Sequence, residues 1–170
     1  MRRKKVRFRM ENIQNILNLI RTGEQQEEAV DLIGEYLEDL FRRNKEIVQM
    51  SFKSGFTKDF ANKIAENLNI MGISENQQES EKFLNQLLEE VKKMKKIKLT
   101  ISFIPQDQLI EKLSFWAKNN FSEKVIFELT VDPKIVGGAI VISPEGEYKD
   151  YSLLRKIEKY FSLAETTAVI

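Results

Sequence analysis

Two aspartates are the residues of this sequence best suited to acid–base chemistry. Asp132 precedes a proline, and Asp150 follows in the same C-terminal stretch. A pair of carboxylates can divide the roles of general acid and general base when their environments differ. Each of these two nevertheless has a sufficient local task, one beside a turn proline and the other at a helix start. We therefore interpret both as structural residues rather than as a catalytic pair.

The composition excludes most other reaction chemistry. The chain has no cysteine and no histidine, which removes thiolate chemistry, the commonest general base and the commonest metal ligand. Glu27-Glu28 and Glu89-Glu90 fall on polar faces of predicted helices, and no metal-ligand spacing is present. Gly137-Gly138 is not part of a G-x-x-x-x-G-K or G-x-G-x-x-G phosphate loop. We therefore expect no enzyme, no cofactor and no metal site, but a binding protein.

The length and the hydropathy place the chain in an ordinary class. Its 170 residues suffice for one large domain or two small ones, and 42% apolar with 31% charged residues is typical of a soluble protein. No apolar run approaches the 18 or more residues that span a bilayer. The basic start, MRRKKVRFRM, lacks the apolar stretch of a signal peptide. These features predict a cytoplasmic protein.

Apolar residues recur with a helical period over residues 1–95. The spacing predicts four amphipathic helices with short joints, and such a series is typical of a helical bundle. Their expected extents are Met10–Arg21, Thr22 to about Asn44 with a possible extension to Met50, a third helix capped by Thr57, and a fourth capped by Ser74 with a capping box at Gln77. Thr22 and Gln25 have the same capping-box spacing. Residues 1–95 are thus predicted to form an N-terminal helical bundle.

At Ile97 the period changes from 3.6 to 2, which predicts a domain boundary and a strand. The second domain, residues 97–170, is predicted to be a small β-α-β-β-α domain, so the fold class is α+β. The apolar positions on which this rests are Ile97, Leu99, Ile101 and Phe103 in the first strand, Leu109, Ile110, Leu113, Trp116 and Ala117 on the inner face of a helix, Val125–Val131 in the second strand, Ala139–Ile142 in a mostly buried third strand, and Leu153, Leu154, Ile157, Tyr160 and Phe161 on a closing helix.

The segment that begins at Asp132 carries the most specific local signals. Proline after Asp132 ends the strand, because it has no N–H for the ladder. The glycine pair 137–138 allows a positive φ or a close backbone approach. Residues 144–146, Pro-Glu-Gly, predict a turn, and Asp150 or Ser152 can cap the helix that follows.

This segment resembles the C-terminal signature of the F-type ATP synthase delta subunit, whose mitochondrial counterpart is the oligomycin-sensitivity-conferring protein. The family pattern runs D-P-x-[IL]-x-G-G, strand, D-x-S and a basic helix. It is carried here by Asp132, Pro133, Ile135, Gly137, Gly138, Asp150, Ser152 and Arg155. The resemblance covers about residues 97–161. Phe103 and Gln106 depart from the S-A-x-P-L that often follows the family's first C-terminal strand, and residues 1–95 lack its usual A-L-F-like opening helix.

The resemblance implies a stator component of a rotary ATP synthase. Such a subunit holds the catalytic hexamer still while the rotor turns during proton-driven ATP synthesis. Its helical domain would receive amphipathic N-terminal helices of the alpha subunits, and its C-terminal domain would engage the C-terminal end of the membrane-anchored b subunits. It would be cytoplasmic and would meet the membrane only through the complex. The sequence does not identify the residues that line the groove.

Two other interpretations remain open. One is a related peripheral-stalk subunit of E type or a flagellar export-ATPase regulator, although these are normally one long coiled coil in their helical part. The other is an RNA-binding protein that uses the basic run in residues 1–9 and the lysines at 92, 93, 95, 96 and 98. With a net charge of only +1, we favour a solvated terminus and a helix-end charge run for these residues. No nucleic-acid partner is therefore expected.

Overall fold

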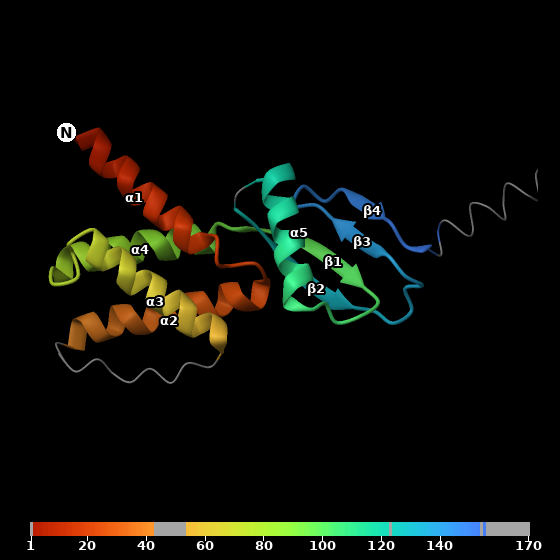
Figure 1. The fold of residues 1–170 in the computed structure, drawn as a ribbon, viewed down its shortest axis with the longest axis horizontal. Coiled ribbons are helices and arrows are strands. Elements are labelled where there is room, and N and C mark those ends of the chain that lie inside the picture. Colours follow the sequence, from red (N-terminus) through yellow and green to blue (C-terminus); the bar gives the residue numbers. More distant parts are fainter. Residues whose placement is uncertain (1, 43–53, 123, 154, 156–170) are drawn as a thin grey trace, which may run out of the picture. The chain divides into compact units, whose positions relative to one another are not determined.

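The computed structural model describes residues 2–42, 54–122, 124–153 and 155. The described chain has a mixed α/β fold with five helices and one four-stranded mixed sheet (Figure 1). It divides into two compact units, Met1–Met94 and Lys95–Ile170. The first unit holds the helices α1 to α4, and the second holds the sheet and α5.

Four helices make up the described part of the first unit. They are α1 (Arg2–Leu17), α2 (Gly23–Arg42), α3 (Gly55–Ile70) and α4 (Gln77–Lys92). Helix α2 packs against α3 and α4, and α1 packs against the same two helices. The apolar stripes of the sequence supply the interior, where the buried side chains include Ile13, Ile16, Leu17, Ile20, Ile33, Phe60, Ile64, Phe83, Leu84 and Leu87.

The helix starts differ from those that the sequence predicts. Helix α1 begins at Arg2 rather than Met10, so the basic run 2–9 has a helical backbone. Ser54, not Thr57, is the N-cap of α3: its hydroxyl accepts from the Thr57 N–H at 3.2 Å, and the Thr57 hydroxyl accepts from the Ser54 N–H at 3.1 Å. Asn76, not Ser74, caps α4. In both cases the cap is the residue immediately before the first helical turn, from which a side chain reaches the third N–H. The possible extension of α2 to Met50 lies outside the described residues.

Polar side chains join the helices of this unit. The Ser54 hydroxyl donates to Glu28 Oε2 at 2.7 Å, which ties the start of α3 to α2. The buried Gln26 side chain donates to the Val91 carbonyl at 2.8 Å near the end of α4. The predicted Thr22 cap is present, since its hydroxyl accepts from the Gln25 N–H at 3.3 Å. These bonds fix helix ends, where backbone groups lack partners within the helix.

The sheet of the second unit has the order β2-β1-β3-β4. Its strands are β1 (Lys95–Ile101), β2 (Val125–Val131), β3 (Ala139–Ile142) and β4 (Tyr148–Asp150), and α5 (Asp107–Asn120) connects β1 to β2. Strand β1 is parallel to β2 and antiparallel to β3, which is antiparallel to β4. Because β1 ends at Ile101, Phe103 lies beyond the strand and is 51% exposed, contrary to the alternation predicted from the sequence.

Helix α5 packs against one face of this sheet (Figure 1). The core beneath it consists of Ile97, Leu99, Ile101, Val125, Phe127 and the helix residue Ala117, with Leu113 packed against them. The prediction that Trp116 faces inward is wrong, because its side chain is 48% exposed. Ala117 is buried as predicted, Ser114 is buried as well, and the small size of both allows the helix to lie close to the strands.

The C-terminal part of the sheet contains a strand that the sequence does not reveal. Strand β4 has three residues and no apolar alternation, so it carries no period-2 signal. Strand β3 is half-buried along its whole length rather than mostly buried. The predicted closing helix, except for Leu153 and Arg155, lies outside the described residues.

Candidate functional site

The first half of the D-P-x-I-x-G-G motif forms a hydrogen-bonded turn at the end of β2. The Asp132 N–H donates to the Ile101 carbonyl at 2.8 Å, which continues the pairing of β1 and β2. The Asp132 carboxylate then accepts from the Lys134 N–H at 2.9 Å, and its carbonyl accepts from the Ile135 N–H at 3.1 Å. Pro133 occupies the second position of this turn, where its fixed φ is favoured. Ile135 is buried, so the turn is anchored by one apolar side chain.

The glycine pair follows, and both residues have a positive φ. The φ angles are +65° at Gly137 and +82° at Gly138. Gly138 also lies against the backbone of the C-terminal segment: a Cβ there would overlap the Tyr151 carbonyl oxygen and lie 3.0 Å from Ser152 Cα. The sequence left positive φ and close approach as alternatives, and Gly138 has both.

Backbone hydrogen bonds join the two halves of the motif. The Tyr151 N–H donates to the Ala139 carbonyl at 2.8 Å, and the Leu153 N–H donates to the carbonyls of Val136 and Gly137, each at 3.1 Å. Residues 136–139 and 151–153 are therefore adjacent although the β3–β4 hairpin separates them in the chain. The two segments thus form one hydrogen-bonded structure. We call it the glycine latch (residues 132–139 and 150–153).

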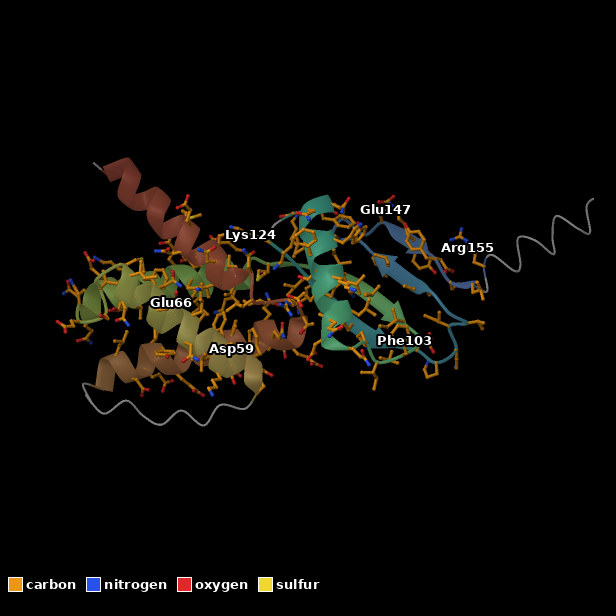
Figure 2. All side chains as sticks on the ribbon, in the orientation of Figure 1. Asp59, Glu66, Phe103, Lys124, Glu147 and Arg155 are labelled. Atoms are coloured by element: carbon orange, nitrogen blue, oxygen red, sulfur yellow. The ribbon has the colours of Figure 1, made fainter. Side chains whose placement is uncertain are left out.

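Asp150 and Ser152 complete the latch. The Asp150 carboxylate accepts from the Ser152 N–H at 2.8 Å, which makes a local turn, and Ser152 is 5% exposed. Hydrogen bonds from the Ser152 hydroxyl and N–H hold the pKa of Asp150 below its usual value, and the positive charge of Arg155 acts in the same direction. Figure 2 shows Arg155 just beyond β4. Most of the closing helix that Asp150 or Ser152 is predicted to cap lies outside the described residues, so this capping stays a prediction.

The geometry gives Asp132 and Asp150 separate structural roles. Each carboxylate accepts a backbone N–H two residues further along the chain, at Lys134 and at Ser152. No hydrogen bond between the two side chains is present in the described part of the chain. Nor do the described residues contain a group of three or more acidic side chains that could hold a metal ion. Both carboxylates thus stabilise local turns within the latch.

Large apolar side chains are exposed mainly on the second unit. Phe115 is 72% exposed, and the half-exposed Trp116 packs edge-to-face against Phe121 with ring centroids 5.6 Å apart. Phe103 and Ile104 are exposed in the loop that leads into α5, where Figure 2 labels Phe103. We call Phe115, Trp116 and Phe121, at the C-terminal end of α5, the α5 aromatic surface. Clustered exposed aromatics mark interaction sites more often than single exposed residues do. The sequence alone does not reveal this surface, because it places Trp116 in the core.

The latch carries a second exposed apolar group. Val136, Tyr151 and Leu153 are each about half exposed, and they belong to the segments that the latch hydrogen bonds join. In the described part of the first unit, by contrast, the large apolar side chains exposed to this degree are Met10 and Ile70. Half-buried apolar residues recur along α2, at Val30, Tyr36, Leu37 and Leu40.

Carboxylates face several of the lysines between α4 and β1. Lys93 pairs with Glu89 at 3.5 Å and with Glu90 at 3.3 Å, and the hydrogen bond that Lys93 donates to Glu90 is the main cause of its raised pKa. Lys95 pairs with Glu145 at 3.3 Å. Lys98 lies 4.0 Å from Glu128 on the neighbouring strand. Paired lysines of this kind form a mixed-charge surface rather than a cationic patch.

Compared with known proteins, the chain matches no family model and no curated sequence. In the described residues, no helix is both long and apolar enough to cross a membrane.

Proposed function

We propose that this protein is a peripheral-stalk subunit of delta type in a rotary F-type ATP synthase. The observation that carries the proposal is the glycine latch. Residues of the D-P-x-I-x-G-G half and of the D-x-S half of the family signature meet there, at Gly138 and Tyr151. Positions 137 and 138 both have a positive φ, which glycine adopts without strain. At position 138 a side chain would also overlap the backbone of Tyr151. The two glycines of the motif therefore have a physical explanation.

The proposed architecture is an N-terminal helical bundle, built from α1 to α4, followed by a small α/β domain. The element order supports it, because four helices precede a β-α-β-β series. In this proposal the bundle receives amphipathic N-terminal helices of the alpha subunits, and the half-buried apolar residues of α2 are candidates for that contact. The α5 aromatic surface is the candidate contact for the C-terminal region of the b subunits. The protein would be cytoplasmic and attached to the membrane only through the complex.

A stator needs strong binding rather than reactive groups. Nanomolar attachment corresponds to about −12 kcal/mol, which a well-packed helix in a groove can supply. The local structural roles of Asp132 and Asp150 are consistent with a non-catalytic subunit. Exposed aromatic residues on a hydrogen-bonded domain suit a protein whose task is to hold two partners in place.

The other two interpretations fit the structure less well. The described helices of the first unit have 16 to 20 residues each, whereas an E-type or export-ATPase regulator calls for one long coiled coil. The RNA-binding interpretation uses the basic run in residues 1–9 together with the lysines at 92–98, and of these lysines Lys93, Lys95 and Lys98 face carboxylates.

Peptide calorimetry tests the proposal. The full chain should bind a peptide that copies the first ~20 residues of its own organism's alpha subunit, with an affinity that changes only a few-fold between about 50 and 200 mM salt. An alanine in place of one central apolar residue of the peptide should cost about 2 kcal/mol or more.

A second titration uses the C-terminal region of the b subunit. Phe115→Ala should weaken this binding without affecting the alpha peptide, and a pull-down from native membranes should recover both partners. If neither peptide binds at tens of micromolar, the stator function is wrong for this chain.

A further inference from the structure

The first residues of α1 differ in charge from the rest of the chain. Residues 2–9 contain six basic side chains and no acidic one. The chain has 27 basic and 26 acidic residues in total, which leaves 21 basic against 26 acidic elsewhere. A segment of charge +6 is therefore attached to a body of net charge −5. The whole-chain value of +1, on which the interpretation as a merely solvated terminus rests, hides this separation.

The charged segment is continuous with a firmly held helix. Helix α1 runs from Arg2 to Leu17 (Figure 1). Ile13, Ile16 and Leu17 are buried. In the sequence, Arg3 and Arg7, like Lys5 and Arg9, have the i, i+4 spacing at which like charges oppose helix formation. The first acidic residue is Glu11. A helical conformation of residues 2–9 is consequently favoured when an external anion neutralises them.

The spacing of these residues distinguishes between two kinds of polyanion. Basic residues occur at positions 2, 3, 4, 5, 7 and 9, so at 100° per residue they surround the helix axis. The two apolar residues, Val6 and Phe8, are two positions apart and do not share a face. A helix that lies in a membrane surface needs one apolar face, which this segment lacks. A helix that lies in a groove with phosphates on both sides can use basic residues on several sides of its own axis. The major groove of B-form DNA is such a groove, and it admits an α-helix.

We propose that residues 2–9 of α1 bind the phosphate backbone of duplex DNA, independently of its sequence. The binding energy comes from release of counterions as the six cations approach phosphates. DNA binding is confined to residues 2–9, because the rest of the chain is acidic and Lys93, Lys95 and Lys98 face carboxylates. The inference is independent of the stator proposal, which uses other surfaces.

The test is a salt titration of DNA binding by the full chain. Fluorescence anisotropy with a mixed-sequence duplex should give a log–log slope with salt approaching about −5, and about a 10³-fold loss of affinity between about 50 and 200 mM salt. A variant with glutamine at all six positions should lose this binding but keep its unfolding midpoint, since glutamine is a good helix former and the buried anchors are untouched. The matched control, Lys93→Gln with Lys95→Gln and Lys98→Gln, should bind like the wild type.

The proposal is overturned if the duplex does not bind at micromolar protein in low salt, or if the six-glutamine variant binds as well as the wild type. Binding to vesicles rich in phosphatidylserine without binding to the duplex would also overturn it, and would identify a membrane surface as the ligand.

Discussion

Gly138 lies directly beneath the carbonyl oxygen of Tyr151, so closely that a Cβ at this position would overlap it. The contact joins the turn before β3 to the segment after β4, and the hydrogen bond from Tyr151 N–H to the Ala139 carbonyl lies beside it. A glycine here therefore meets two separate requirements, a positive φ of +82° and a backbone approach that excludes any side chain.

The two requirements can be separated by comparing two glycines. Gly146 has a φ of +87°, and a Cβ added there would have no neighbour within 4 Å, so Gly146→Ala measures the cost of the positive φ alone, about 1–2 kcal/mol. Gly138→Ala adds overpacking against backbone and should cost more than about 3 kcal/mol. Denaturant unfolding of the two variants measures both. Equal losses would mean that the Tyr151 contact relaxes at no cost.

A second prediction concerns pH. Because the folded pKa of Asp150 lies below its unfolded value of about 3.9, its charge stabilises the fold above that pH, and this contribution is lost as the pH falls through the folded pKa. Asp150→Asn keeps an acceptor for the Ser152 N–H but removes the charge. The urea midpoint of the variant should lie below that of the wild type near neutral pH, and the two should converge below about pH 4. A constant gap at all pH values would contradict the electrostatic explanation.

A third prediction compares two phenylalanines of the second unit. Phe127 is 2% exposed under α5, and Phe115 is 72% exposed on it. Phe127→Ala should cost about 3–5 kcal/mol, as other large-to-small core changes do. Phe115→Ala should cost less than about 1 kcal/mol, because that ring already contacts water. Thermal unfolding of both variants checks the comparison, and a large loss from Phe115→Ala would show that α5 is oriented differently.

The sequence predicts the element types well because periodicity reports them directly. The helical spacing of apolar residues predicts a buried stripe at Ile13, Ile16 and Ile20, and alternation predicts a strand at Ile97, Leu99 and Ile101. Both sets are buried. The predicted helix starts are less accurate, since Thr57 and Ser74 have plausible capping chemistry but the nearby Ser54 and Asn76 accept from the N–H groups of the first turn. Sequence spacing does not tell which of several nearby polar residues caps a helix.

The candidate site was predictable only in part. The sequence indicated the motif positions and gave the glycine pair a conformational reason, but it could not show that residue 138 meets residue 151, because that contact depends on the unpredicted strand β4. The α5 aromatic surface was missed for a different reason. Trp116 is apolar and adjacent to the buried Ala117, and apolarity alone does not distinguish a core residue from an exposed one.

Because β1 lies inside the sheet, the order of synthesis leaves it without partner strands for a time. Both of its neighbours, β2 and β3, follow it in the chain, so β1 leaves the ribosome before any partner strand exists. Until β2 is complete at residue 131, Ile97, Leu99 and Ile101 have no partner strand, and unpaired strands can aggregate. The alternating Lys96 and Lys98 place charges within this segment, as gatekeeper residues do in strands prone to aggregation. Their importance would then be greatest in the nascent chain, before the ion pair between Lys98 and Glu128 can form.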